Sequence, residues 1–169
     1  MKSLRTLVLA CSVVAVAGCS NSYLDDTNTV DFGGTGAGAA SGLPSDPTSP
    51  AYFKASIGDR ILFEVDQSTL NDGARAVLAG QADWLTSNPD YTAVIEGHAD
   101  EQGTREYNLA LGARRANAVR EYLVSRGVAA SRLKTVSYGK ERPLEICSAE
   151  SCYAKNRRAV TVLAGGLTG

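Results

Sequence analysis

Two segments of the chain repeat apolar residues at the spacing of an amphipathic helix. The first covers residues 72–87, where Asn71 is placed to cap the start and Asn88 precedes a proline, which drives it out of the α region. The apolar face of this helix is expected to contain Ala74, Val77, Leu78, Gln81 or Ala82, and Leu85. The second covers roughly residues 107–126 and is followed by Gly127, a residue suited to a left-handed C-terminal cap. Its apolar face is expected to contain Leu109, Ala113, Ala116, Val119 and Leu123.

Four shorter segments are rich in β-forming residues and predict strands. They are Arg60–Val65, Tyr91–Gly97, Leu133–Tyr138 and Arg158–Leu163. Alternation along the first of them is expected to place Phe63 and Val65 on the same face. The order is strand, helix, strand, helix, strand, loop, strand, and about 110 residues suffice for a single core. The pattern therefore predicts an α+β fold, a two-layer sandwich with both helices packed on one mixed four-stranded sheet.

The N-terminus has the features of a secretory signal in residues 1–18. Lys2 and Arg5 precede an apolar run that is too short to span a membrane. The run ends in VAGC at residues 16–19, which resembles a bacterial lipobox and implies cleavage before Cys19 and acylation of that residue. The alternative is an ordinary signal peptide with a chance cysteine near its cleavage site. The residue after Cys19 is Ser20 and not an aspartate. By resemblance to enteric lipoproteins, this favours sorting of the protein to the outer membrane.

Residues 19–53 lack a periodic apolar pattern and include the stretch GGTGAGAASGLPSDPTSP at 33–50. Such a segment buries too little apolar surface to offset its ordering entropy, so we expect a flexible tether. A Gly-rich coil of about 30 residues has a root-mean-square span of roughly 30 Å. The sequence thus predicts a lipid-anchored tether at 19–53 and one domain at 54–169.

Charge and cysteines exclude several classes of protein. The chain has a formal charge of −1, and removal of Lys2 and Arg5 with the signal leaves about −3. The sequence therefore offers no basic stripe that could bind nucleic acid. Cys147 and Cys152 lack the histidines that a structural zinc site needs and the spacing of a redox motif, so a local disulfide is the favoured interpretation in an oxidising compartment.

The sequence HADEQGTREYN at 98–108, followed by LGARRANAVREYL at 111–123, contains the candidate binding groups. Asp100 follows a predicted strand, where a rigid scaffold can position it, and Arg115 lies in the following helix. A carboxylate accepts hydrogen bonds from an ammonium group and a guanidinium grips a carboxylate, so the two together suit a ligand that carries both charges. The alternative is a structural ion pair between Asp100 and Arg115.

These motifs resemble the peptidoglycan-binding domain of OmpA-like proteins, above all the lipoproteins of the Tol system. The resemblance covers nearly all of the ordered part of the chain and implies that Asp100 and Arg115 hold meso-diaminopimelate of the peptidoglycan stem peptide. It assigns Asp66 to the acidic position that closes the first strand, with Val65 where relatives often carry phenylalanine. Leu111 matches an apolar position of the family's pocket, although leucine in a helix is usually a core residue.

The other motif residues are expected to have structural roles. Asn108 is expected to brace the loop and His98 to form hydrogen bonds there, while Arg114 is expected to be solvated. For Arg157 and Arg158, in AKNRRAV at 154–160, the resemblance implies structural roles at a turn and a β-strand. It also implies that both arginines lie near the sugar chain of the wall.

The resemblance also implies a partner, the periplasmic β-propeller protein of the Tol system, and a role in envelope constriction during division. No cofactor or metal is expected. His98 is the only histidine and no Gly-x-Ser-x-Gly nucleophile motif is present, which disfavours a hydrolase. Two alternatives remain, namely an OmpA-like wall-binding lipoprotein without a Tol partner and a wall-acting lipoprotein enzyme.

Overall fold

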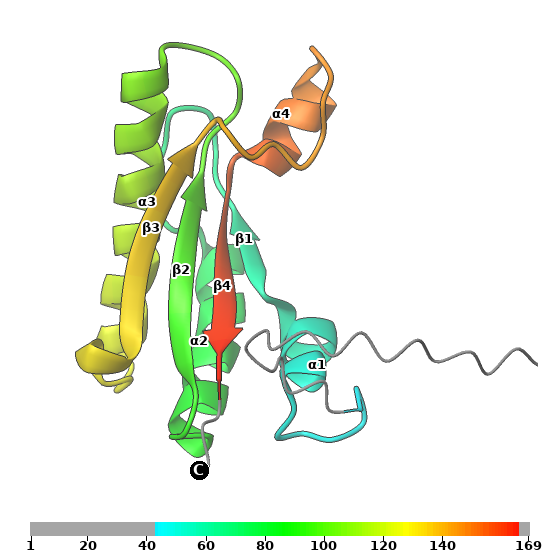
Figure 1. The fold of residues 1–169 in the computed structure, drawn as a ribbon, viewed down its shortest axis with the longest axis vertical. Coiled ribbons are helices and arrows are strands. Elements are labelled where there is room, and N and C mark those ends of the chain that lie inside the picture. The colour runs from blue at the N-terminus through cyan, green and yellow to red at the C-terminus, as the bar shows by residue number, and fades with distance from the viewer. Residues whose placement is uncertain (1–42, 166–169) are drawn as a thin grey trace, which may run out of the picture. The chain divides into compact units, whose positions relative to one another are not determined.

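Four strands form one mixed sheet in the computed structural model of the protein, which describes residues 43–165. The strands are β1 (Arg60–Leu62), β2 (Thr92–His98), β3 (Leu133–Gly139) and β4 (Arg158–Ala164). Their order in the sheet is β1-β4-β2-β3, with β2 and β3 parallel and β4 antiparallel to both β1 and β2 (Figure 1). The predicted α+β architecture is confirmed. Cys19, the signal and most of the predicted tether lie outside the described residues.

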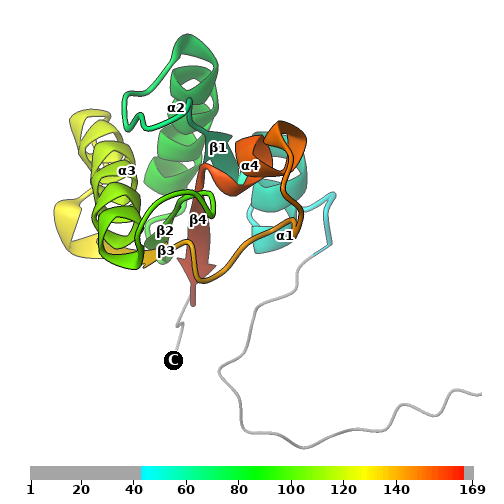
Figure 2. The same cartoon turned by 90° about the horizontal axis from the view of Figure 1, so that it is seen from above.

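The two long helices, α2 (Asp72–Ser87) and α3 (Arg105–Ser125), pack on the same face of the sheet (Figure 2). The predicted cap of α2 is present, since Oδ1 of Asn71 accepts a hydrogen bond from Ala74 N at 2.8 Å. At the end of α3, Gly127 has φ +102° and Val128 N donates to Leu123 O at 3.1 Å, as expected of a left-handed cap. One residue of the predicted apolar face is wrong, because Leu109 is exposed.

Helix α3 approaches β2 closely enough for backbone to meet backbone. A Cβ atom on Gly97 would lie 1.8 Å from Gly112 O, and one on Gly112 would lie 2.4 Å from Ser137 Oγ. Only glycine fits at these two positions. The close approach fixes α3, which carries Asn108, Leu111 and Arg115, against the strand that ends before Asp100.

The first strand is shorter than predicted. It ends at Leu62 instead of Val65, although Phe63 N still donates to Arg157 O at 2.9 Å. Phe63 is buried, whereas Val65 is 54% exposed, so the prediction that the two share a face is wrong. The chain leaves the sheet here because residues 64–67 form a turn, in which Gln67 N donates to Glu64 O at 3.2 Å.

Shorter helices occupy regions without a helical pattern. The predicted cysteine loop contains α4 (Glu150–Asn156), and a 3₁₀ turn, Ala130–Arg132, precedes β3. Before β1 lie α1 (Pro50–Tyr52) and a π-helical segment, Phe53–Gly58. None of the described helices has the length and apolar character needed to cross a membrane.

The segment before β1 packs on α2. Nε1 of Trp84 donates to Pro47 O at 2.7 Å, and the ring of Phe53, which is 1% exposed, lies 5.0 Å from the Trp84 ring. Ser49 caps α1 and is also buried. The packed part of the chain therefore begins before residue 54, the boundary expected from composition.

Candidate functional site

A cavity of about 280 Å³ opens where the ends of β1 and β2 meet the start of α3. It is lined by Val65, Asp66, Asp100, Gln102, Gly103, Tyr107, Asn108 and Leu111. The structure thus brings Val65, Asp66, Asp100, Asn108 and Leu111, all singled out in the sequence, to one cavity. Arg115 is absent from the lining. Tyr107 was not predicted, although it precedes Leu111 by one helical turn and therefore shares its side of α3.

Asp100 presents a largely buried carboxylate at the cavity. The residue is 9% exposed; its Oδ1 accepts from Gln102 N at 3.2 Å, and its Oδ2 pairs with Arg157 Nη1 at 3.2 Å. Among the described residues its ion-pair partner is therefore Arg157 and not Arg115, which overturns the alternative of a direct Asp100–Arg115 pair. Two fixed donors hold the carboxylate in one orientation at the cavity wall.

Arg115 does not line the cavity and is 0% exposed. Its guanidinium donates to three backbone carbonyls: Nε to Gln67 O at 2.8 Å, Nη1 to His98 O at 2.8 Å and Nη2 to Glu64 O at 3.2 Å. Burial lowers the pKa of Arg115 to about 10, with the nearby Asp100 carboxylate acting against that shift. The group therefore remains charged at neutral pH, and its positive charge interacts with Asp66 and Asp100, the two acids that line the cavity.

The turn at residues 64–67 places Asp66 at the cavity. Asp66 has φ +55°, a left-handed conformation that aspartate tolerates better than most residues. Arg115 holds the turn by binding the carbonyls of both Glu64 and Gln67. The hydroxyl of Tyr107 donates to Asp66 Oδ1, and this hydrogen bond raises the pKa of Tyr107. The aromatic wall that Val65 does not supply thus comes from α3.

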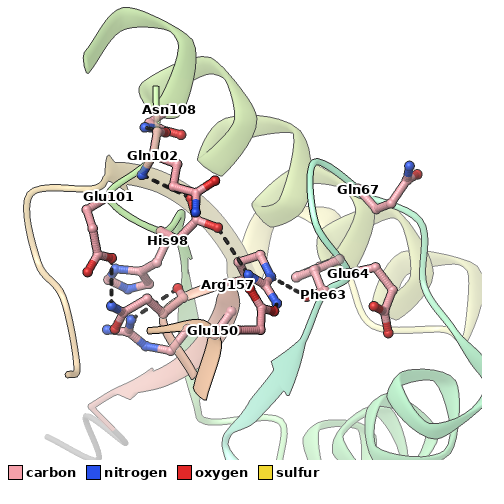
Figure 3. A network of polar contacts seen from close by, with 12 residues as sticks. Phe63, Glu64, Gln67, His98, Glu101, Gln102, Asn108, Glu150 and Arg157 are labelled. Atoms are coloured by element: carbon pink, nitrogen blue, oxygen red, sulfur yellow. Dashed lines mark hydrogen bonds and ion pairs between the residues drawn. The ribbon is translucent and has the colours of Figure 1, made fainter. Parts of the chain in front are cut away.

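The loop between β2 and α3 is braced from two sides. Nδ2 of Asn108, which is buried, donates to Gln102 O at 2.6 Å, and Lys140 Nζ donates to Gly103 O at 2.7 Å (Figure 3 shows Asn108 and Gln102). Gln102 and Gly103 are thereby fixed as part of the cavity lining. Asn108 has the bracing role expected of it.

His98 does not form the hydrogen bonds expected of its side chain. The residue is 2% exposed, and neither ring nitrogen has a hydrogen-bond partner within residues 43–165. Burial lowers the pKa of His98 to about 4, and the charges of Arg158 and Arg142 lower it further in the same direction. The imidazole is therefore neutral at pH 7, and His98 contributes to the site through its backbone carbonyl, which accepts from Arg115.

The remaining motif arginines differ in environment. Arg114 is exposed as expected, with its guanidinium 5.9 Å from the centre of the Tyr107 ring. Arg157 is 4% exposed and pairs with both Asp100 and Glu150. Burial acts to lower the pKa of Arg157, but the hydrogen bonds to Glu150 and Asp100 raise it overall. Arg158 is also buried, and Nη2 donates to Arg142 O at 3.2 Å. No sequence pattern indicated these partners, because they lie far from Arg157 and Arg158 along the chain or in a loop.

Cys147 and Cys152 form a disulfide in the structure, with their Cα atoms 6.0 Å apart. Within the described residues, histidine, cysteine and acidic side chains form no group of three or more that is arranged to hold a metal ion. The lining residues give the cavity two carboxylates, an aromatic hydroxyl and an apolar wall, a combination suited to an ammonium group on an aliphatic chain.

The family model described as the OmpA family matches residues 62–157. A peptidoglycan-associated lipoprotein of Mesorhizobium japonicum is 52% identical over 159 residues, which cover 94% of this chain and 91% of that protein. A protein of the same name from Haemophilus influenzae is 39% identical and covers 94% of this chain and 97% of its own length.

Solved structures share the fold. The crystal structure of the peptidoglycan-associated lipoprotein from Burkholderia pseudomallei is 39% identical, has a TM-score of 0.63, and covers 71% of this chain and 98% of its own. The C-terminal domain of Helicobacter pylori MotB is 21% identical with a TM-score of 0.60, covering 63% of this chain and 84% of that one. At that identity the likeness to MotB concerns the fold alone.

Proposed function

Since the chain belongs to the OmpA family, which matches it over residues 62–157, we propose that it is an envelope lipoprotein that binds peptidoglycan noncovalently. The names of its relatives support association with peptidoglycan. The structural observation that carries the proposal is the carboxylate of Asp100, 9% exposed and held at the wall of the cavity. No catalytic step is part of the proposal.

The ligand is the free end of meso-diaminopimelate in the stem peptide, which carries an ammonium and a carboxylate on one carbon. Asp100 accepts hydrogen bonds from the ammonium group, and Asp66 adds a second negative charge at the same cavity. Tyr107 and Leu111 contact the aliphatic part of the side chain. A charge-assisted hydrogen bond to a carboxylate as buried as that of Asp100 contributes about 1.5–3 kcal/mol.

Arg115 binds the ligand carboxylate in this proposal. A guanidinium has five N–H groups, and carbonyls occupy one N–H on each of its three nitrogens. The side chain is 0% exposed, so a ligand reaches it only if the turn at residues 64–67 moves aside. That turn is exposed, and its movement would release the carbonyls of Glu64 and Gln67 from the guanidinium, from whose N–H groups the ligand carboxylate then accepts hydrogen bonds.

The anchor and the partner rest on the sequence and the family resemblance. Acylated Cys19 holds the protein on the outer membrane, and residues after it let the domain reach the wall. The Tol-system β-propeller protein is the proposed partner, in work that maintains the envelope and constricts the outer membrane during division. Co-purification with that propeller from envelope extracts tests the partner, and its absence would favour a wall-binding lipoprotein outside the Tol system.

Two synthetic tripeptides test the ligand. One is L-Ala–γ-D-Glu–meso-diaminopimelate, and the other has L-Lys in the last position, which keeps the ammonium and removes the neighbouring carboxylate. Calorimetric titration is expected to give at least about ten-fold tighter binding of the diaminopimelate peptide, because only it satisfies both charges. Equal affinities for the two peptides would show that the protein does not bind the carboxylate next to the ammonium group. If neither peptide binds, the proposal is overturned.

A further inference from the structure

Arg157 connects the cavity with a disulfide-closed turn at residues 147–152. Its side chain is 4% exposed and has three partners: Nε donates to Phe63 O at 3.2 Å, Nη1 to Asp100 Oδ2 at 3.2 Å, and Nη2 to Glu150 Oε1 (Figure 3). Each nitrogen of the guanidinium therefore has a different acceptor. Two of these acceptors are fixed by the sheet and the cavity, and the third, Glu150, comes from α4.

Glu150 is held in place by the covalent structure around it. It is the first residue of α4 and lies between Cys147 and Cys152, which are bonded. Asn156, at the other end of α4, is buried; its Oδ1 accepts from Leu144 N at 2.7 Å, and its Nδ2 donates to Glu101 Oε2 at 3.1 Å. The segment that carries Glu150 is thus fixed both by a disulfide and by a bond to the cavity loop.

We propose that Arg157 is a positioning residue for Asp100 and that Glu150, held by the disulfide-closed turn, keeps Arg157 from neutralising Asp100. This inference rests on the proposed function, in which Asp100 takes the ligand ammonium. Arg157 is the ion-pair partner of Asp100, and it therefore competes with the ligand's ammonium group for the Asp100 carboxylate. While Glu150 holds Nη2, only Nη1 reaches Asp100, and the carboxylate keeps capacity for a second cation. Without Glu150, both terminal nitrogens are free to form the bidentate pair that arginine and carboxylate prefer.

The variant Glu150→Gln weakens this restraint, because it removes the negative charge that holds Nη2 without changing the size of the side chain. Its matched control is Glu145→Gln, which removes the same charge from the same loop, since Glu145 pairs with Lys155 at 3.1 Å and not with Arg157. Glu150 is 66% exposed on its side chain, so the expected effect is modest, about three-fold weaker binding. Glu150→Asp keeps the carboxylate and is expected to restore most of the affinity.

The experiment titrates the full acylated chain in detergent micelles with the diaminopimelate tripeptide, whose alanine amine is blocked by acetylation, and with the same peptide acetylated also on the side-chain amine of diaminopimelate. Glu150→Gln is expected to bind the free-amine peptide about three-fold more weakly than Glu145→Gln and the acetylated peptide equally well. A merely structural role would weaken both peptides alike and lower the thermal midpoint. The double variant Cys147→Ser/Cys152→Ser is expected to weaken the free-amine peptide similarly, with no further loss when Glu150→Gln is added.

The outcomes distinguish a failure of the role of Glu150 from a failure of the proposed function. Equal affinities of Glu150→Gln and Glu145→Gln for the free-amine peptide would overturn the role of Glu150 and leave the proposed function in place. Additive losses from opening the disulfide and from Glu150→Gln would show that the turn does not act through Glu150. If the wild type binds neither peptide, the proposed function fails and this inference fails with it.

Discussion

At the scale of single residues, Arg115 is the group on which the site is built. Three backbone carbonyls from two segments of the chain, the turn at residues 64–67 and the end of β2, accept hydrogen bonds from its guanidinium, which has no exposed surface. Arg115→Ala is expected to lower the free energy of unfolding by about 3–5 kcal/mol, because the carbonyls lose their donors inside the protein. The free energy of unfolding of Arg115→Lys is expected to lie between those of Arg115→Ala and the wild type, since an ammonium group cannot reach all three carbonyls at once.

Urea denaturation followed by circular dichroism measures this effect. Arg114→Ala is the matched control, because Arg114 is the adjacent residue on α3 and is exposed, and its loss is expected to change stability by no more than about 0.5 kcal/mol. Equal stability of the Arg115→Ala and Arg114→Ala variants would show that the three carbonyls do not depend on Arg115. Because Arg115→Ala perturbs the fold, a loss of ligand binding in that variant does not by itself assign a ligand contact.

His98 gives the protein a measurable pH dependence. Burial lowers its pKa from 6.5 to about 4, so between these values the unfolded chain binds a proton that the folded chain does not. The contribution of His98 to stability is therefore complete well above pH 6.5 and falls as the pH decreases, by about 1.6 kcal/mol between pH 6.5 and pH 5. Unfolding experiments across this window are expected to show a steeper slope for the wild type than for His98→Gln, and identical slopes would mean that His98 titrates normally in the folded protein.

At the scale of elements, the contact between α3 and β2 determines where the site residues lie. A methyl group on Gly97 would overlap Gly112 O, so Gly97→Ala forces the helix away from the strand. We expect this variant to lose about 3 kcal/mol of stability and to bind ligand more weakly, because Leu111 and Asn108 move with the helix. The control is Gly73→Ala on α2, where the added atom would lie 3.5 Å from its nearest neighbour. Thermal unfolding of the two variants decides the matter, and equal midpoints would contradict the close approach.

The elements differ in how well the sequence predicts them, and the reason is how local their causes are. Helix α2 is predicted well because its cap, Asn71, and its apolar period lie within the segment itself. Strand β1 was predicted too long because RILFEV has strand-forming residues throughout, whereas its end is set by a turn that Arg115 holds from a distant helix. Helix α4 has too few residues for a visible period and depends on Asn156 and a disulfide.

The site residues also differ in whether the causes of their positions are local in the sequence or distant. Asp66, Asp100 and Leu111 were singled out by motif positions and do line one cavity. The partner of Asp100 was not predictable, because Arg157 lies 57 residues away and a basic residue before a strand has no pattern that names its acid. Tyr107 was visible in the motif, but its contact with Asp66 depends on a left-handed backbone conformation at a non-glycine residue.

At the scale of the whole molecule, the proposed function requires that the domain remain attached to the membrane while it touches the wall. Cys19 lies outside the described residues, and the mature chain is expected to begin there and to fractionate with the outer membrane. Each buried acyl CH₂ contributes about 0.8 kcal/mol, so two or more chains form a stable anchor. Cys19→Ser is expected to leave the membrane fraction or to accumulate as uncleaved precursor. Outer-membrane fractionation of that variant equal to the wild type would mean that the lipobox interpretation is wrong.

The central claim is that Asp100 binds the ammonium group of the stem peptide. The most direct measurement is a cycle of four affinities, in which wild type and Asp100→Asn are each titrated with the alanine-acetylated diaminopimelate tripeptide and with the same peptide acetylated also on the side-chain amine of diaminopimelate. Asp100→Asn keeps the size of the side chain and removes its charge, so the free-amine peptide is expected to bind at least about ten-fold more weakly. The acetylated peptide is expected to bind both proteins within about two-fold of each other, since it has no charge for Asp100 to meet. Equal losses for the two peptides would contradict the account, because Asp100 would then support the cavity without contacting the ammonium group.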